Sequence, residues 1–174
     1  WESNMDLIRT LPEFNLYEDF WKIYTNSDHQ PPQYTALGSK TEEALLSDGC
    51  EIYGTVCRSI IGPGVVVEKG AVVKDSIVMK GSVVGKGTVV EKAIVAENVT
   101  IGENAHLGVG EYAPSKYDPK VYQSDLVTIG ENSVIPDGVK IGKNTAIAGE
   151  TVAEDYQDGL LASGDYIIKA GGVR

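Results

Sequence analysis

Only a few side chains in this sequence have types that could do chemistry on a bound molecule. His106 ends the phrase Ile101-Gly-Glu-Asn-Ala-His. The pKa of histidine lies near neutrality, so a well-placed imidazole can act as a general base that removes a proton from a hydroxyl or an amine. No companion motif supports this role, and a histidine at a surface corner is the simpler interpretation.

Basic side chains near the C-terminal end offer a second kind of chemistry, which is anion binding. The basic residues of this part are Lys140, Lys143, Lys169 and Arg174. Their positive charges could contact a phosphorylated small-molecule effector. The alternative is that they are exposed lysines that keep the protein in solution. We take Lys169, Lys143 and Lys140 as the candidate effector-binding residues.

No catalytic, cofactor-binding or metal-binding residue can be assigned from motifs. Two histidines, His29 and His106, are too few for a three-histidine zinc site. Cys50 and Cys57 do not form a CxxC pair, so we interpret them as reduced thiols of a cytoplasmic protein, with a disulfide as the alternative. No GxSxG, HExxH or Walker pattern occurs.

Charge and hydrophobic patterning exclude some partners. The chain has 174 residues and a formal net charge of −10, which repels phosphate backbones and argues against nucleic acid. It contains no run of about 18 apolar residues that could span a membrane. No basic segment followed by an apolar one marks a signal peptide at the start. We therefore expect neither a nucleic acid nor a membrane as a partner.

A six-residue repeat between Ile61 and Ile147 supplies the elements that position these residues. Each unit starts with an aliphatic residue and has glycine or asparagine three residues later, as in Ile61-Gly-Pro-Gly and Ile101-Gly-Glu-Asn. Glycine and asparagine adopt the left-handed backbone conformation most readily, so each of them marks a tight corner. The rule holds at positions 49, 64, 70, 81, 87, 98, 104, 132, 138 and 144.

Longer rows combine these units. Ile61, Val78 and Val95 start successive rows and are 17 residues apart. Each row has three short sides, which predicts a triangular prism of stacked parallel strands, that is, a mainly β protein with a parallel β-helix. The aliphatic residues expected to point inward are Leu46, Ile52, Val56, Ile61, Val67, Val73, Val78, Val84, Val90, Val95, Ile101 and Leu107.

Two interruptions of the repeat are expected to have separate roles. Residues 108–128 contain three tyrosines and two prolines, which predicts a loop inserted into the prism. From about Thr151 the repeat fades, and this tail is expected to cap the open end of the β-helix.

The N-terminal part has a different composition. Residues 1–34 contain seven of the thirteen aromatic side chains. Trp1, Met5 and Ile8 are spaced for one face of a short helix, and residues 21–25 are predicted as a strand. The Pro31-Pro32 pair indicates a linker. We therefore divide the chain at 1–34 and 35–174, and its start at Trp1 suggests a piece of a longer protein.

Several phrases resemble one bacterial enzyme family. They are Trp1-Glu-Ser-Asn-Met-Asp-Leu-Ile, Trp21-Lys-Ile-Tyr-Thr, Gln30-Pro-Pro-Gln-Tyr, Ser47-Asp-Gly-Cys-Glu-Ile-Tyr-Gly and Gly70-Ala-Val-Val-Lys-Asp-Ser. In this order they resemble the C-terminal part of glucose-1-phosphate adenylyltransferase, also called ADP-glucose pyrophosphorylase. The resemblance implies that residues 1–34 are the end of a nucleotidyltransferase domain and its linker, and that the β-helix is left-handed.

The resemblance also implies a function. The family makes ADP-glucose and pyrophosphate from ATP and glucose 1-phosphate for glycogen biosynthesis, with Mg²⁺ and ATP bound by an N-terminal domain that has no counterpart in this sequence. The β-helix of the family contributes to a tetramer and to a regulatory site, where Lys169 is the nearest match to an effector-binding residue. The chain alone is then expected to be inactive and to hold no cofactor.

Three other readings remain open on the sequence. The chain could be the same region of the family's non-catalytic partner subunit. It could be a hexapeptide-repeat acyltransferase that uses His106 as its base. It could also be a purely structural β-helix, because many unrelated functions use this architecture.

Overall fold

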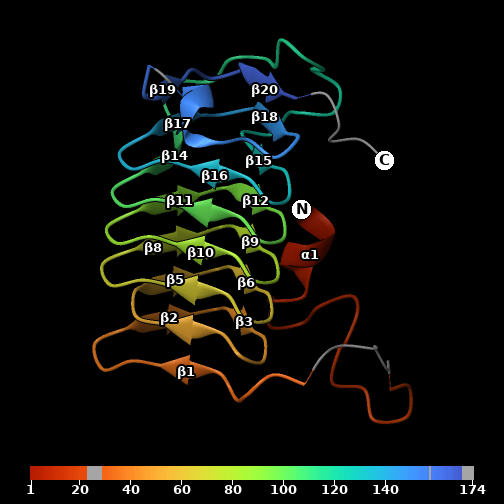
Figure 1. Ribbon diagram of the computed structural model, residues 1–174. Helices are drawn as coiled ribbons and strands as arrows, with labels where there is room; N and C mark the ends of the chain where they lie inside the picture. Colours follow the sequence, from red (N-terminus) through yellow and green to blue (C-terminus); the bar gives the residue numbers. More distant parts are fainter. Residues whose placement is uncertain (23–28, 157, 170–174) are drawn as a thin grey trace.

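The computed structural model in Figure 1 describes residues 1–22, 29–156 and 158–169. Every pairing between its described strands is parallel. The strands form three sheets, which are the three faces of a prism (Figure 1). The predicted triangular β-helix is confirmed.

The three sheets take one strand each from every coil. Sheet A has six strands: β1 (Tyr34–Thr35), β4 (Glu51–Ile52), β7 (Val66–Val67), β10 (Val83–Val84), β13 (Thr100–Ile101) and β16 (Val134–Ile135). Sheet B has seven strands: β2 (Lys40–Glu42), β5 (Thr55–Cys57), β8 (Val72–Lys74), β11 (Val89–Glu91), β14 (His106–Val109), β17 (Lys140–Gly142) and β19 (Leu160–Leu161). Sheet C also has seven: β3 (Leu45–Leu46), β6 (Ile60–Ile61), β9 (Ile77–Val78), β12 (Ala93–Val95), β15 (Val127–Ile129), β18 (Thr145–Ala148) and β20 (Tyr166–Ile168).

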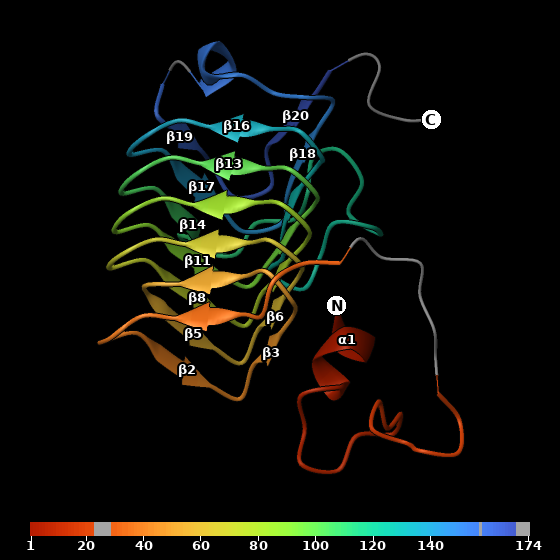
Figure 2. The same ribbon diagram turned by 60° about the horizontal axis from the view of Figure 1, so that its bottom comes forward.

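The coil is left-handed, as the family resemblance implied. In Figures 1 and 2 the strands of sheet A point to the left, the chain continues through sheet B behind them and returns through sheet C on the right. The coils rise from β1 towards β20 as the chain proceeds. This sense is opposite to the right-handed crossover of most parallel β structures.

The interior contains the aliphatic residues that the repeat predicted. Eleven of the twelve are at most 1% exposed, and Leu46, in the first coil, is half-buried because no coil covers it from below. Successive coils place identical positions over one another, for example Val67 below Val84 and Val84 below Ile101. Each coil therefore buries its aliphatic residues against the next coil, and the prism is stable only as a stack.

Two of the three corners follow the glycine and asparagine rule, and Asn144 follows it at the third, between sheets B and C. All ten positions that the sequence singled out have positive φ, from 54° at Asn104 to 78° at Gly70. The residue after each of these corners is buried, and the hydroxyls of Ser82 and Thr88 bridge coils there. The Ser82 Oγ, for example, accepts the backbone N–H of Val99 at 3.1 Å and donates to the carbonyl of Ala96 at 2.8 Å.

The upper end of the prism is covered by a short helical turn. The 3₁₀ helix η1 (Ala153–Tyr156) contacts β16 at the end of sheet A. The hydroxyls of Tyr156 and Thr151 lie 2.8 Å apart in this buried region. Burial raises the pKa of Tyr156 to about 12, against a smaller lowering by the hydrogen bond to Thr151.

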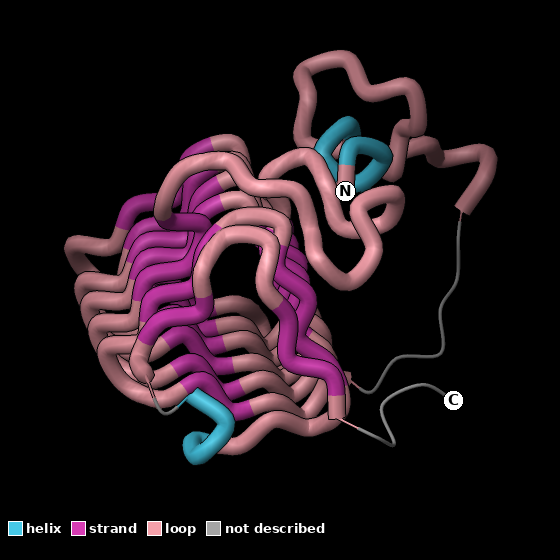
Figure 3. The backbone as a smooth tube through the Cα atoms, turned by 90° about the horizontal axis from the view of Figure 1, so that it is seen from above, coloured by secondary structure: helices cyan, strands magenta, loops and turns pink. Residues whose placement is uncertain are grey.

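The N-terminal part lies beside the prism and not inside it. The predicted short helix is present as α1 (Glu2–Asp6), and Figure 3 shows it next to the stack of coils. Residues 7–22 contain no helix or strand. The strand predicted for residues 21–25 and the basic residue Arg174 fall largely or wholly outside the described residues. Within the described ranges, no helix is long and apolar enough to cross a membrane.

Candidate functional site

His106 and Lys140 are neighbours on the outer face of sheet B. They occupy matching positions of the paired strands β14 and β17, and both side chains are exposed. Over residues 1–22, 29–156 and 158–169, no group hydrogen-bonds to the imidazole of His106. A general base needs a partner that fixes its tautomer and orientation, so this geometry favours a surface histidine.

Lys169 takes part in closing the end of the prism. Its Nζ lies 2.9 Å from the Oδ2 of Asp155, which also accepts the backbone N–H of Val152 at 2.7 Å. The Val152 hydrogen bond, followed by that of Lys169, lowers the pKa of Asp155. Since Lys169 follows β20 and Asp155 belongs to η1, this ion pair joins the last strand of sheet C to the cap.

Lys143 lies at a different corner from Lys169. It lies two residues before β18, whereas Lys169 follows Ile168, the partner of Ala148 at the far end of that strand. A four-residue strand separates these ends by ~13 Å. Lys140 faces outward from sheet B. The structure of this chain alone therefore does not bring the three predicted lysines into one site.

The corner between sheets B and C, called the B/C edge below, carries charged residues in the first four coils, whereas Asn144 and Gly164 occupy it in the last two. Glu43, Arg58, Asp75 and Lys92 occupy it in successive coils, with φ between 42° and 53°. This conformation costs a non-glycine residue roughly 1–2 kcal/mol. The sequence rule did not identify this corner, although the 17-residue spacing of Arg58, Asp75 and Lys92 is a signal that could have done so.

Ion pairs connect neighbouring coils along the B/C edge. The Nε and Nη2 atoms of Arg58 each donate to the Asp75 carboxylate at 2.7 Å, and Lys74 Nζ donates to Glu91 at 2.7 Å. The hydrogen bond to Asp75 raises the pKa of Arg58, and that to Glu91 raises the pKa of Lys74. These pairs are solvent-exposed, so each adds little to the stability of the fold.

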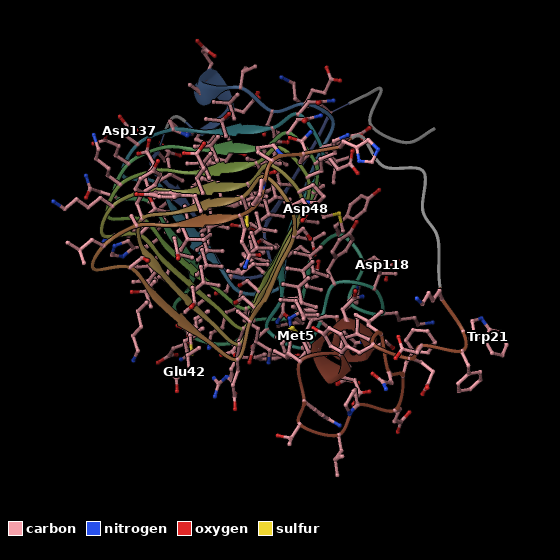
Figure 4. All side chains as sticks on the ribbon, turned by 90° about the horizontal axis from the view of Figure 1, so that it is seen from below. Met5, Trp21, Glu42, Asp48, Asp118 and Asp137 are labelled. Carbon is pink, nitrogen blue, oxygen red and sulfur yellow. The ribbon has the colours of Figure 1, made fainter. Side chains whose placement is uncertain are left out.

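The N-terminal segment is attached to this edge through Trp1. Its indole Nε1 donates to the backbone carbonyl of Asp75 at 2.9 Å. The Lys92 ammonium lies 5.7 Å from the centroid of the Trp1 ring, within the range of a cation–π interaction. Figure 4 shows Met5 of α1 between the helix and the prism, while Trp21 projects away from both.

A small cavity lies farther along the same edge and includes Lys143. Its volume is about 220 Å³, and its lining also contains Asp75, Lys92 and Asp125. Asp125 belongs to the segment between β14 and β15, so the loop expected at 108–128 emerges from the B/C edge. The irregular features of the molecule therefore gather along one edge of an otherwise regular prism.

The cysteines and metal-binding residue types form no further site. Cys50 and Cys57 are both free thiols, which contradicts the disulfide alternative. Burial raises the pKa of Cys50, whose thiol donates to the carbonyl of Ser47 at 2.9 Å. In the part of the chain that the structure describes, no three histidine, cysteine or acidic side chains are arranged to hold a metal ion.

Parallel strands coiled around an aliphatic interior, with glycine and asparagine corners, define a hexapeptide-repeat β-helix protein. A family described as GlmU-like, C-terminal hexapeptide matches residues 33–129, and the chain belongs to this family.

The similarity to particular proteins extends over nearly the whole chain. The chain is 67% identical to glucose-1-phosphate adenylyltransferase of Lachnospira eligens over 98% of its length. The enzymes of the same name from Thermotoga maritima and Acetivibrio thermocellus are 55% and 42% identical over 97% and 98% of this chain. In each case the chain spans 40% of the length of the relative. The family resemblance recognised in the sequence is confirmed.

Proposed function

We propose that this chain is the C-terminal oligomerisation and regulatory domain of a glucose-1-phosphate adenylyltransferase. The observation that carries the proposal is the 67% identity over 98% of the chain to a relative of which it spans only 40%. The parent enzyme would form ADP-glucose and pyrophosphate from ATP and glucose 1-phosphate in the cytoplasm. ATP and Mg²⁺ would be bound by a domain outside this chain.

The chain alone is proposed to be inactive. Its strands place no nucleophile, base and orienting group together among the described residues, and Arg58, Lys74 and Lys169 are held in ion pairs. The assay is pyrophosphorolysis of ADP-glucose by the chain and by the full-length protein that contains it. Activity of the isolated chain would overturn the assignment, whereas an inactive full-length protein that assembles with an active subunit would identify the non-catalytic partner subunit.

The exposed apolar side chains of residues 11–21 support the division at residue 34. These residues expose at least half of each of their large apolar and aromatic side chains: Leu11, Phe14, Leu16, Tyr17, Phe20 and Trp21. A surface of this kind marks a contact that is buried elsewhere. We propose that it packs against the catalytic domain of the parent enzyme.

A tetramer is proposed for the parent enzyme, with the prism contributing one of its contacts. Sheet A is the barest face, because α1 and the inserted loop lie elsewhere (Figure 2). Its outer surface includes Tyr34 and Tyr53, whose ring centroids are 5.8 Å apart, and the exposed Val134. Tyrosine is enriched where protein surfaces meet. Light scattering on the full-length protein, with Tyr53→Glu as the test variant, measures whether this face holds subunits together.

Effector binding by Lys140, Lys143 and Lys169 stays a prediction for the assembled enzyme. Lys169 already pairs with Asp155, so its role in this chain is structural. Lys143 is the best placed of the three because it lines a cavity. The acyltransferase alternative has less support, since no described group orients His106, and saturable acetyl-CoA binding lost in His106→Ala would revive it.

A further inference from the structure

The segment that interrupts the repeat is attached to the prism at two levels. It leaves sheet B after Val109, the end of β14, and enters sheet C at Val127, the start of β15. Residues 110–126 form no helix or strand, and Figure 1 shows the segment rising beside the stack to the level of β20. Residues 113–125 are called the strap below. Because the strap has no ladder of its own, a few contacts to the prism must hold it.

The lower attachment of the strap is the side chain of Asn144, which is fully buried. Its Oδ1 accepts the N–H of Asp125 at 2.8 Å, and its Nδ2 donates to the carbonyl of Ala113 at 2.8 Å. One side chain therefore holds both ends of the strap. Breaking these bonds would leave a buried donor and a buried acceptor without partners, so this end is the firmly fixed one.

The corner at Asn144 does not itself require this side chain. Asn144 has φ of 55° and Asn104, at another corner, has φ of 54°. Glycine adopts this conformation at least as easily. The side chain of Asn104 is exposed and forms no hydrogen bond with the described residues. Holding the strap is thus a second role that Asn144 has in addition to forming a corner.

The upper attachment joins the strap to the last coil. The N–H of Lys116 donates to the carbonyl of Gly164 at 2.7 Å, and its ammonium pairs with the carboxylate of Asp165. The ring centroid of Tyr117 lies 5.1 Å from that of Tyr166 in β20. The side chains of the ion pair are 66% and 32% exposed, so water competes for it. The upper attachment is therefore weaker than the lower one.

A glycine allows the strap to approach the last coil closely. Gly164 has φ of 79°, and a methyl group there would collide with the carbonyl oxygen of Pro114 in the strap. Gly159, in the same coil, has φ of 63° and no atom within 4 Å of such a methyl group. The two glycines share the same backbone requirement, but only Gly164 faces the strap.

The lower end of the strap contains features that oppose its closed position. Ser124 and Asp125 both have φ of 64°, a conformation that is unfavourable for residues other than glycine. The Oδ1 of Asp125 is buried and has no hydrogen-bond partner among the described residues. Local strain of this kind persists only where surrounding contacts maintain it. The contacts at Asn144 and at the last coil therefore hold the strap closed against this strain.

We propose that residues 113–125 form a strap that opens at its upper end, with Asn144 as the hinge, and that the closed strap fastens the last coil to the prism. β20 is paired on one side only, with β18, so the strap supplies contacts that a further coil would otherwise make. Opening breaks the contacts to Gly164, Asp165 and Tyr166 and leaves the coils below intact. Segments with exposed hydrogen bonds and few buried apolar contacts open in this local way. The inference does not depend on the proposed function, because it concerns this chain alone.

The experiment is hydrogen exchange of the complete chain, followed by mass spectrometry. It compares three regions: the strap, residues 158–168 of the last coil, and strands β10 and β11 as the reference. Gly164→Ala is the test variant that holds the strap away from the last coil, and Gly159→Ala is its matched control. Asn144→Gly removes the hinge contacts, and Asn104→Gly is its control at another corner. Melting temperatures verify that all four variants fold.

The expected result for the glycine pair is a local acceleration of exchange. Gly164→Ala should speed exchange in the strap and in the last coil at least about tenfold, whereas Gly159→Ala should change the strap less than about threefold. Neither variant should alter β10 or β11. Equal exchange of the strap in the two variants would overturn the proposal. Acceleration that reaches β10 and β11 equally would overturn it as well, because the strap would then open only when the whole prism unfolds.

The asparagine pair tests the hinge separately. Asn144→Gly should speed exchange of the Asp125 amide, which loses its acceptor, and should free both ends of the strap. Asn104→Gly keeps the same corner conformation and should leave the strap unchanged. If the two variants exchanged alike in the strap, Asn144 would be a corner residue only and the hinge assignment would be wrong.

Discussion

The interior of the prism and the segment 11–21 are both rich in apolar residues, yet their surroundings are opposite. In the prism, Val67, Val84 and Ile101 stack in successive coils with at most 1% exposure. In the segment, Leu11 is 88% exposed, Phe20 84% and Trp21 74%. Apolar residues in a periodic pattern bury one another, whereas those of the segment have no period and remain exposed among the described residues. The first region is a buried core, and the second is an exposed apolar surface that we propose as a contact with the catalytic domain.

The strongest test of this contrast places a charge inside the prism. Val84→Asp buries an unpaired carboxylate between two coils, which costs more than about 4 kcal/mol. We expect loss of the cooperative unfolding transition in circular dichroism. Val83→Asp is the matched control, because Val83 is the neighbouring residue of β10 and faces outward. A melting temperature of Val84→Asp equal to that of Val83→Asp would refute the inward assignment.

Two glycine substitutions with smaller effects on stability separate the cost of forcing coils apart from the cost of a strained corner. A methyl group at Gly85 would lie 2.6 Å from the carbonyl oxygen of Gly102, so Gly85→Ala forces two coils apart and is expected to cost about 2–3 kcal/mol. Gly138 has φ of 69° and no atom within 4 Å of such a methyl group. Gly138→Ala therefore carries only the conformational cost, about 1 kcal/mol. Urea denaturation measures both, and the reverse order would show that corners, not coil spacing, limit this fold.

The sequence predicted the corners correctly where glycine or asparagine occupies them, because these residues have one main structural reason to recur at a fixed spacing. Gly70, Asn98 and Asn104 could be assigned to corners because few other residues adopt positive φ cheaply. The B/C edge was not predicted, because Arg58, Asp75 and Lys92 adopt the same conformation against their own preference. The one- or two-residue connections between β5 and β6, β8 and β9, and β11 and β12 impose it there. The backbone preferences of single residue types therefore do not predict positive φ at this corner.

The candidate site was harder to predict for a different reason. The cavity combines Lys92, Asp125 and Lys143 from two coils and an inserted loop. The length of that loop interrupts the 17-residue period, so spacing along the sequence no longer indicates which side chains meet. Lys143 was identified by its charge alone, and its neighbours Lys92 and Asp125 were missed.

A pH-dependent change in stability is expected at the cap, where Asp155 of η1 binds Lys169. It should be smaller than the changes at Val84 and Gly85. The pKa of Asp155 is lowered by the N–H of Val152 and then by Lys169. A carboxyl with a lowered folded-state pKa stabilises the protein above its unfolded pKa, about 3.9, and loses this contribution as the pH falls through the folded value. Asp155→Asn should thus lower the melting temperature slightly at pH 7, and the difference should vanish at strongly acid pH. A difference that is unchanged at low pH, or is matched by Glu154→Gln, would contradict this role.

The smallest effect on stability is expected in the segment that looks most hydrophobic. Phe20 is 84% exposed and lies outside all helices and strands, so Phe20→Ser should change the free energy of unfolding of the isolated chain by no more than about 0.5 kcal/mol. It should, however, reduce binding of a hydrophobic dye, because it removes part of an exposed apolar surface. On the proposal that this segment packs against the catalytic domain, the same substitution should clearly lower the melting temperature of the full-length protein. Equal melting temperatures of the full-length wild type and variant would show that residues 11–21 are not a domain contact.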